Sequence, residues 1–142
     1  MSADPGQRPP PGADAALASA AARHAAIRWV GVPLLLTGLL LLVLAILSTA
    51  RGGPWGNVPL GLLSTGLGLA AFGANHDAAM ALAWRARSNG VALPDGLANE
   101  LDTELQKDRS AILALRASPR MALVMPVVAI CAQGWLAARL VA

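Results

Sequence analysis

The order of apolar and charged residues divides the chain into three long apolar segments and one segment with a helical repeat. The longest apolar segment, residues 29–48, reads WVGVPLLLTGLLLLVLAILS and has no charged side chain. At about 1.5 Å of rise per residue, a helix of that length spans roughly 30 Å, which matches the hydrocarbon core of a bilayer. A helix that is apolar on every side is typical of a membrane span. The segment therefore predicts a transmembrane helix over about 29–49.

Two later apolar segments predict two more transmembrane helices, over about 57–80 and 121–140. Residues 51–54, RGGP, have the composition of a turn between the first and second helices. The first apolar segment, with basic residues ahead of it, also resembles a signal peptide. It is longer than the usual apolar region of about 7–15 residues, and a signal peptide does not normally have so long a segment in front of it. These two facts favour an uncleaved anchor.

The loop between the second and third spans, residues 85–118, contains one amphipathic pattern. Leu97, Leu101 and Leu105 recur at every fourth position, and Ile112 and Leu115 continue the same apolar face. Acidic side chains precede basic ones along this segment, which suits the dipole of a helix. We expect a cytoplasmic helix here whose apolar face binds a partner.

Together these segments predict an all-α integral membrane protein with three transmembrane helices and one cytoplasmic amphipathic helix. A single helical membrane domain is expected over residues 13–142. Residues 1–12 hold four prolines and few bulky apolar side chains, so we expect a disordered tail. Only 13% of the residues are charged, against about 25% in soluble domains, which argues against an appended soluble domain.

Basic residues indicate the orientation of the spans. Nine lysines and arginines lie in the N-terminal segment and in the loop between spans two and three, and two lie on the opposite side. Because cytoplasmic loops carry an excess of positive charge, we expect a cytoplasmic N-terminus and a periplasmic or extracellular C-terminus. Trp29 and Trp84 would mark the inner interface, and Trp55 and Trp135 the outer one. The arginine-, alanine- and glycine-rich composition favours a bacterial cytoplasmic (inner) membrane protein.

Small residues in the second span predict a surface where two helices approach closely. Ser64 and Gly68 are four positions apart, and so are Gly66, Ala70 and Ala74. This spacing lets two backbones come into contact, and the first or third span is the expected partner. The alternative is that glycine and alanine are simply frequent in a membrane helix of this composition.

The best candidate for chemistry is the triplet Asn75-His76-Asp77. If Trp84 marks the inner interface, Asp77 lies about 10 Å deeper, where a charge costs roughly 2.5–3.5 kcal/mol and signals a partner or an ion path. Histidine accepts and releases protons near neutral pH, so His76 and Asp77 are candidate proton- or ion-conducting groups. Adjacent side chains on a helix point about 100° apart, however, so these two do not form one site alone. The alternative is that the span ends near Ala74 and the triplet lies among the lipid headgroups.

No catalytic arrangement is evident in the sequence. It offers no nucleophile with a base, no glycine-rich phosphate loop after a strand, and no spacing of histidine or cysteine typical of a metal site. We therefore expect no enzyme activity, no cofactor and no metal. The net charge of +3 is small and dispersed, which argues against nucleic-acid binding.

The function that we expect from the sequence is that of an accessory or assembly subunit of a larger membrane complex. It would act through packing of the glycine-rich second span against a partner and through the cytoplasmic amphipathic helix. Its expected partners are membrane lipids together with other membrane subunits or a second copy of the chain. A proton- or ion-conducting element and a holin-like membrane permeabiliser are the alternatives.

Overall fold

The computed structural model describes residues 12–107 and 119–142. All regular structure in these two ranges is helical, which confirms the predicted all-α class for the part of the chain described. The tail expected over residues 1–12 lies outside these ranges, except for Gly12. In chain order the elements are α1 (Ala13–Ile27), η1 (Arg28–Val30), α2 (Gly31–Ala50), α3 (Asn57–Ser88), α4 (Asp95–Gln106) and α6 (Pro119–Val141).

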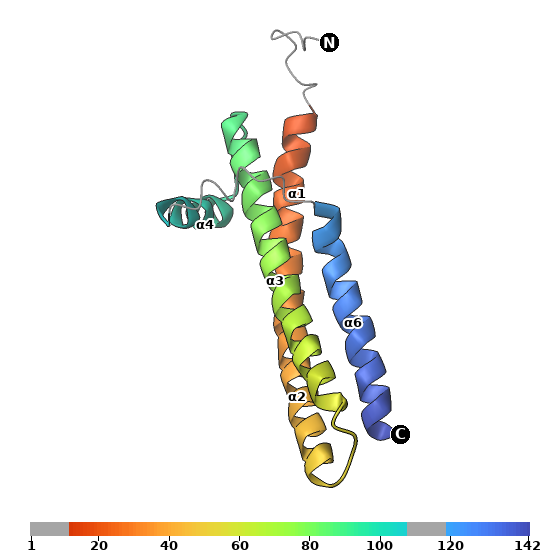
Figure 1. The fold of residues 1–142 in the computed structure, drawn as a ribbon. Coiled ribbons are helices and arrows are strands. Elements are labelled where there is room, and N and C mark those ends of the chain that lie inside the picture. Colours follow the sequence, from red (N-terminus) through yellow and green to blue (C-terminus); the bar gives the residue numbers. More distant parts are fainter. Residues whose placement is uncertain (1–11, 108–118) are drawn as a thin grey trace, which may run out of the picture.

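The long helices run side by side as an up-down-up bundle. α1, η1 and α2 form one continuous rod, α3 returns antiparallel to it, and α6 runs antiparallel to α3 (Figure 1). Three helices in the described ranges are long and apolar enough to cross a membrane: 13–50, 57–88 and 120–141. Their number and order agree with the three predicted spans. The start of α1 and the C-terminus lie at opposite ends of the bundle (Figure 1).

Glycines bring the backbones of α2 and α3 into direct contact. A Cβ atom added to Gly38 would lie 2.8 Å from the Thr65 Cα, and one added to Gly68 would lie 2.6 Å from the Leu35 nitrogen. Gly31 and Gly61 face the opposite helix at similarly short distances. Such contacts allow extensive van der Waals packing, which is the main attraction between helices in lipid. The hairpin is therefore closed by small residues on both helices.

α6 completes the bundle by lying against α3 and α2. Its buried positions recur every three or four residues and include Ala122, Ala129 and Leu136. The amide of Gln133 is also buried, and its Nε2 donates a hydrogen bond of 2.6 Å to the carbonyl oxygen of Leu34. One polar side chain thus fixes α6 to α2 within an apolar interface.

α4 is short and crosses α3 instead of running along it (Figure 1). Its apolar residues Leu97 and Leu101 are buried in a cluster with Ala21 of α1 and Met80 of α3. Trp84 also packs against this cluster. Trp84 is half-buried there, and its expected position at a membrane interface stays a prediction.

Large apolar side chains are exposed along one part of the bundle only. They run from Trp29 to Leu47, from Trp55 to Leu69 and from Met121 to Val141, and we call this surface the apolar belt. At about 1.5 Å per residue its stretches beside α2 and α6 are roughly 27 and 30 Å long. Within the described ranges, residues 13–28 and 70–107 expose no large apolar side chain. The bundle therefore has an apolar part and, beyond it, a more polar end that carries α4.

Candidate functional site

The most concentrated polar cluster lies where η1, α3 and α4 meet, just beyond the apolar belt. Arg28 has a side chain that is only 7% exposed, and its two terminal nitrogens donate to both carboxylate oxygens of Glu100, at 2.6 and 2.7 Å. Such a bidentate pair of charged hydrogen bonds is stronger and more directional than a single one. These hydrogen bonds, and after them the positive charge of Arg28, hold the pKa of the Glu100 carboxyl below its ordinary value, although burial opposes the shift.

His76 extends this cluster from Arg28 to a second carboxylate. Its Nδ1 lies 2.9 Å from Nη1 of Arg28. Because a guanidinium group only donates, Nδ1 must accept, so the ring hydrogen is on Nε2. That nitrogen lies 3.5 Å from Oε1 of Glu104, which is also 3.4 Å from the Lys107 ammonium. The cluster thus connects η1, α3 and α4 through a continuous series of polar contacts from Glu100 to Lys107.

An apolar-walled cavity of about 280 Å³ adjoins the cluster. Trp29 and Phe72 contact each other edge to face with centroids 5.8 Å apart, and Phe72 stacks on His76 at 6.2 Å. Both rings line the cavity, as do Arg28 and Glu100. Since the charged groups around the cavity are already engaged with one another, the arrangement is suited to holding α4 in place.

A second polar contact joins α1, α3 and α6. His24 is 4% exposed, and its Nδ1 lies 2.9 Å from Oδ1 of Asn75. The Asn75 amide donates to the carbonyl oxygens of Ala71 and Ala122, at 2.9 and 2.8 Å. These two bonds fix which way the amide points, so its oxygen faces His24 and the imidazole Nδ1 must donate. Asn75 is therefore fully engaged as a connector between helices.

Buried polar residues do not form a continuous path along the bundle in the described ranges. Asn75 and Ser64 are separated by about 16 Å of helical rise on α3. The interior between these two levels is filled by a buried apolar cluster of Leu34, Ala71 and Ala129, with Leu67 and Met125 packed around it. A chain of proton donors and acceptors is therefore interrupted at this level.

The predicted pair His76 and Asp77 does not form one site. His76 belongs to the cluster with Arg28 and Glu104. Asp77 is half-buried and follows it on α3 just beyond the end of the apolar belt. This position agrees better with the alternative in which the triplet lies at the edge of an apolar layer than with deep burial in it.

The structure separates the two series of small residues on α3. Ser64 and Gly68 face α2, since Cβ atoms built on Gly38 and on Gly68 would contact the opposite backbone. Gly66 has open space around it, Ala70 is exposed and Ala74 is half-buried. The second series therefore differs from the expectation that it packs against the first or third span, because it lies on another side of α3.

The apolar face of α4 differs from its expected role as a free partner surface. Leu97 and Leu101 are 8% and 0% exposed, and Leu105 packs against the same cluster. α1 and α3 of the same chain cover these leucines, since an isolated amphipathic helix gains most by burying its apolar side on the nearest available surface. The other two predicted members of this face, Ile112 and Leu115, lie outside the described residues.

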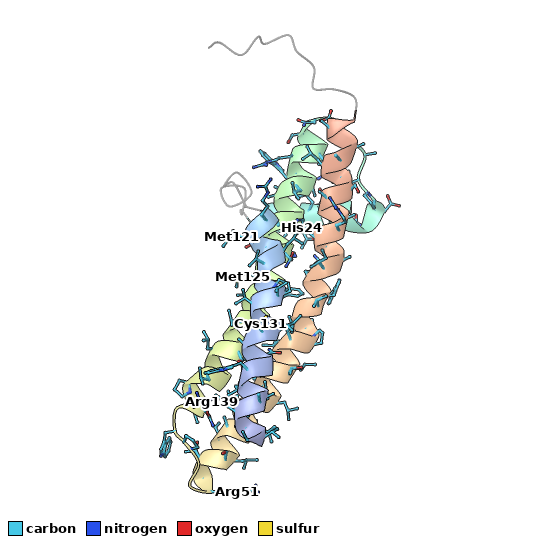
Figure 2. All side chains as sticks on the ribbon, turned by 90° about the vertical axis from the view of Figure 1, so that its right-hand side faces the viewer. His24, Arg51, Met121, Met125, Cys131 and Arg139 are labelled. Atoms are coloured by element: carbon cyan, nitrogen blue, oxygen red, sulfur yellow. The ribbon has the colours of Figure 1, made fainter. Side chains whose placement is uncertain are left out.

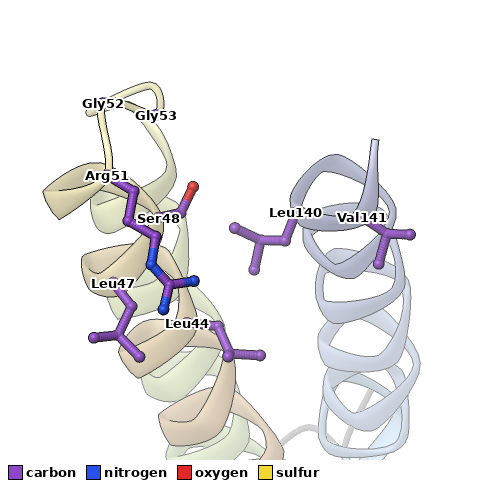
Figure 3. A pocket seen from close by; sticks show the side chains of 8 residues that line it. All are labelled: Leu44, Leu47, Ser48, Arg51, Gly52, Gly53, Leu140 and Val141. Carbon is purple, nitrogen blue, oxygen red and sulfur yellow. The ribbon is translucent and has the colours of Figure 1, made fainter.

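The opposite end of the bundle holds another cavity, of about 550 Å³, between the end of α2 and the end of α6 (Figure 3). The Arg51 side chain runs back along α2 toward Leu47 and Leu44, and Leu140 points toward it from α6 (Figure 3). Arg51 is the one charged side chain in the lining. Ser48 adds one hydroxyl to the lining, and a single cation with one hydroxyl provides no set of groups for catalysis.

Sequence reasoning missed the residues that organise the polar cluster, Arg28 and Glu100, and the buried role of His24. The pairs are 72 and 51 positions apart, so no local spacing reveals them. Within the described residues there is no group of three or more histidine, cysteine or carboxylate side chains that could hold a metal ion. The chain matches no protein-family model, no curated protein sequence and no solved structure.

Proposed function

We propose that this chain is a small, non-enzymatic, three-span membrane protein that serves as an accessory or assembly subunit of a larger membrane complex. In this proposal the apolar belt lies in the lipid of a bacterial inner membrane, and the end with α4 faces the cytoplasm. The length of the belt, close to that of a hydrocarbon core, supports this arrangement. The excess of basic residues toward the end with α4 supports the orientation.

The observation that carries the proposal is an outward-facing series of small residues on α3. Cβ atoms placed on Gly66 and Gly73 would meet no atom within 4 Å. Ala70, between them, is exposed, and exposed leucines at 62, 63 and 69 flank the series. Four other glycines already serve the contact of α2 with α3, so these small residues are not needed to build the bundle. A transmembrane helix of another subunit could approach closely here.

The proposal thus keeps the second span, α3, as the contact surface and leaves out the apolar face of α4. The described leucines of α4 are occupied within the chain, so they no longer support a cytoplasmic partner face. α4 instead braces the polar end of α1 and α3, which keeps the outward face of α3 in a fixed orientation.

A pair of matched glycine substitutions tests this proposal. Gly66→Leu adds a branched side chain to the outward face of α3, and Gly134→Leu adds the same side chain to another open position, on α6. Each variant would be purified with its native partners from membranes in a mild detergent. We expect Gly66→Leu to lose at least nine-tenths of a co-purifying subunit that Gly134→Leu and the parent chain retain.

Two outcomes would contradict the proposal. The same partners and amounts with both variants would remove the α3 face as the contact surface. The other outcome is a purified complex whose mass is a simple multiple of the mass of this chain. If Gly66→Leu dissociates such a complex to the monomer, the α3 face mediates self-association and not a heteromeric contact. A photocrosslinking residue at Leu69, compared with one at Val127 on α6, identifies the protein that lies against each face.

A further inference from the structure

A separate cavity at the α4 end of the bundle lies between α1 and the beginning of α6. Its volume is about 260 Å³, and its polar lining comes from Arg23, His24 and Arg120. Figure 2 shows His24 on α1 and Met121 at the beginning of α6, toward the same end of the bundle. Neither the polar cluster around Arg28 nor the outward face of α3 includes these three side chains.

In the part of the chain that the structure describes, the lining of this cavity carries positive charge and no carboxylate. Within the described residues, no ion pair involves Arg23 or Arg120, whereas Arg28, Arg87 and Lys107 each have an acidic partner. α6 begins at Pro119 next to Arg120, so the positive end of its dipole adds to the field. These features are suited to an anionic ligand.

His24 gives the cavity a buried polar group with a defined orientation. The side chain is 4% exposed, and its Nδ1 is committed to Asn75. Nε2 has no hydrogen-bond partner within the described residues and is the nitrogen that remains for a ligand. Besides two arginines at the surface, the cavity therefore contains an imidazole whose orientation is fixed by the hydrogen bonds that connect α1, α3 and α6.

Apolar side chains make up the rest of the lining. Ile27 comes from α1, Leu123 from α6 and Leu82 from α3. Leu123 is 46% exposed and belongs to the apolar belt, so the cavity opens where the belt ends. A ligand that fits both parts has an anionic head and an apolar tail.

We propose that this cavity binds the phosphate headgroup of an anionic phospholipid, whose acyl chains lie along the apolar belt beside Leu123. Arg23 and Arg120 neutralise the headgroup from the two sides of the cavity, and His24 contacts it from within. Basic pockets between transmembrane helices on the cytoplasmic side are suited to anionic headgroups, since that leaflet is negatively charged. A free phosphate ion would use the same basic groups but would leave the apolar opening beside Leu123 uncovered.

Native mass spectrometry of the full chain in detergent, with phosphatidylglycerol and phosphatidylcholine of identical acyl chains, tests the proposal. We expect the parent chain to retain phosphatidylglycerol in preference to phosphatidylcholine. The double substitution Arg23→Gln/Arg120→Gln should weaken phosphatidylglycerol binding about 25-fold, at roughly fivefold for each arginine near an anionic surface. Phosphatidylcholine binding should be unchanged.

Matched controls separate this site from general charge effects. Arg51→Gln/Arg139→Gln removes the same charge at the other end of the bundle and should preserve the preference. Arg23→Lys/Arg120→Lys should retain most of it, which would show that charge and not a folding defect explains the loss. Equal binding of both lipids by the parent chain, or an unchanged preference in Arg23→Gln/Arg120→Gln, would overturn the proposal. Displacement of bound lipid by millimolar glycerol phosphate would identify a site for free phosphate esters instead.

Discussion

Arg28 and Glu100, which are 72 positions apart in the sequence, are joined by two hydrogen bonds where η1 meets α4. This pair decides how α4 is attached to the bundle. The leucine contacts of α4 are non-directional, since hydrophobic burial depends on area and not on angle. The two-fold hydrogen bond adds direction, because the planar guanidinium and the carboxylate must lie in nearly one plane with two N–H groups facing two oxygens. The pair therefore fixes the register of α4 while Leu97 and Leu101 supply the buried area.

Glu100→Gln should loosen α4 without unfolding the bundle. The change leaves the buried Arg28 without a countercharge, and a fully buried pair broken this way costs about 3–5 kcal/mol. Glu100 is 43% exposed, however, so solvent screens the pair, and we expect a loss of about 1–2 kcal/mol in the stability of α4 docking. Hydrogen exchange of the α4 amides should accelerate by roughly five- to thirtyfold, while exchange in α2 stays unchanged.

Asp102→Asn is the matched control for that experiment. Asp102 also belongs to α4 and pairs with Arg87, but both side chains are well exposed, at 50% and 42%. Exposed pairs contribute little because water competes for both charges. Exchange in α4 should therefore not change measurably. Equal acceleration in both variants would mean that total charge, and not the pair with Arg28, holds α4.

The stability of α4 docking should also depend on pH. The docked carboxyl of Glu100 has a lowered pKa because Arg28 donates to it, so the docked state binds fewer protons than the undocked state. Its contribution to stability is complete above the undocked pKa of about 4.3 and is lost as the pH falls toward the docked value. Protection of α4 amides should therefore be level from pH 7 to 5 and decrease below about 4.3. Glu100→Gln should flatten this dependence, and an unchanged decrease in that variant would assign it to another carboxyl.

Glycine substitutions at the contact of α2 with α3 should be far more damaging than those outside it. A valine at Gly38 or Gly68 places its Cβ within 3 Å of the opposite backbone, which cannot move aside as a side chain would. We expect a loss of about 1–3 kcal/mol or more in bundle stability, as for other overpacked interiors. Gly66→Val on the same helix meets open space and should be close to neutral apart from helix propensity. Thermal unfolding in detergent measures the difference, and equal stability of Gly66→Val and Gly68→Val would contradict it.

The course of the chain through the bundle was predictable because it depends on local composition. Long apolar segments determine the three long helices, and the predicted series includes Gly68, whose backbone lies against Leu34 and Leu35 of α2. The glycines of α2 that lie against α3, Gly31 and Gly38, were not predicted. They are seven positions apart in a leucine-rich segment. Small-residue spacing alone does not tell which side of a helix faces its neighbour. Gly66 has the same spacing pattern as Gly68 and yet faces outward.

The polar cluster could not be predicted for a different reason. In the sequence, Glu100 is one of several charged residues on the polar face of an amphipathic helix. Its partner Arg28 lies in another helix, so nothing near Glu100 in the sequence indicates the pair. His24 similarly lies in an alanine-rich segment with no amphipathic pattern to mark its burial. Such contacts arise from tertiary packing, which brings groups together without any signature in local spacing.

Two buried amides in the bundle should contribute differently to its stability. Asn75→Leu removes bonds that connect three helices and leaves Nδ1 of His24 without its acceptor, a loss of about 1–3 kcal/mol. Gln133→Leu removes a short bond to the Leu34 carbonyl and a long one, of 3.5 Å, to the Ser64 carbonyl, and side-chain bonds between membrane helices average about 0.6 kcal/mol each. Unfolding measured in the same detergent should therefore rank Asn75→Leu as the more destabilised variant. The reverse ranking would place the main polar connection at Gln133.

The bundle alone should not conduct protons. His24, Asn75 and His76 lie at the α4 end, while the next buried polar level, at Ser64 and Gln133, is about 16 Å away along α3. Leu34, Ala71 and Ala129 fill the interior between these levels, and protons do not cross such a layer without polar groups or water. Liposomes containing the purified chain and a pH-sensitive dye should therefore show proton flux no higher than protein-free liposomes, and His76→Ala should not change it. A flux above background that falls with His76→Ala would establish the conducting role and would require the apolar layer to open.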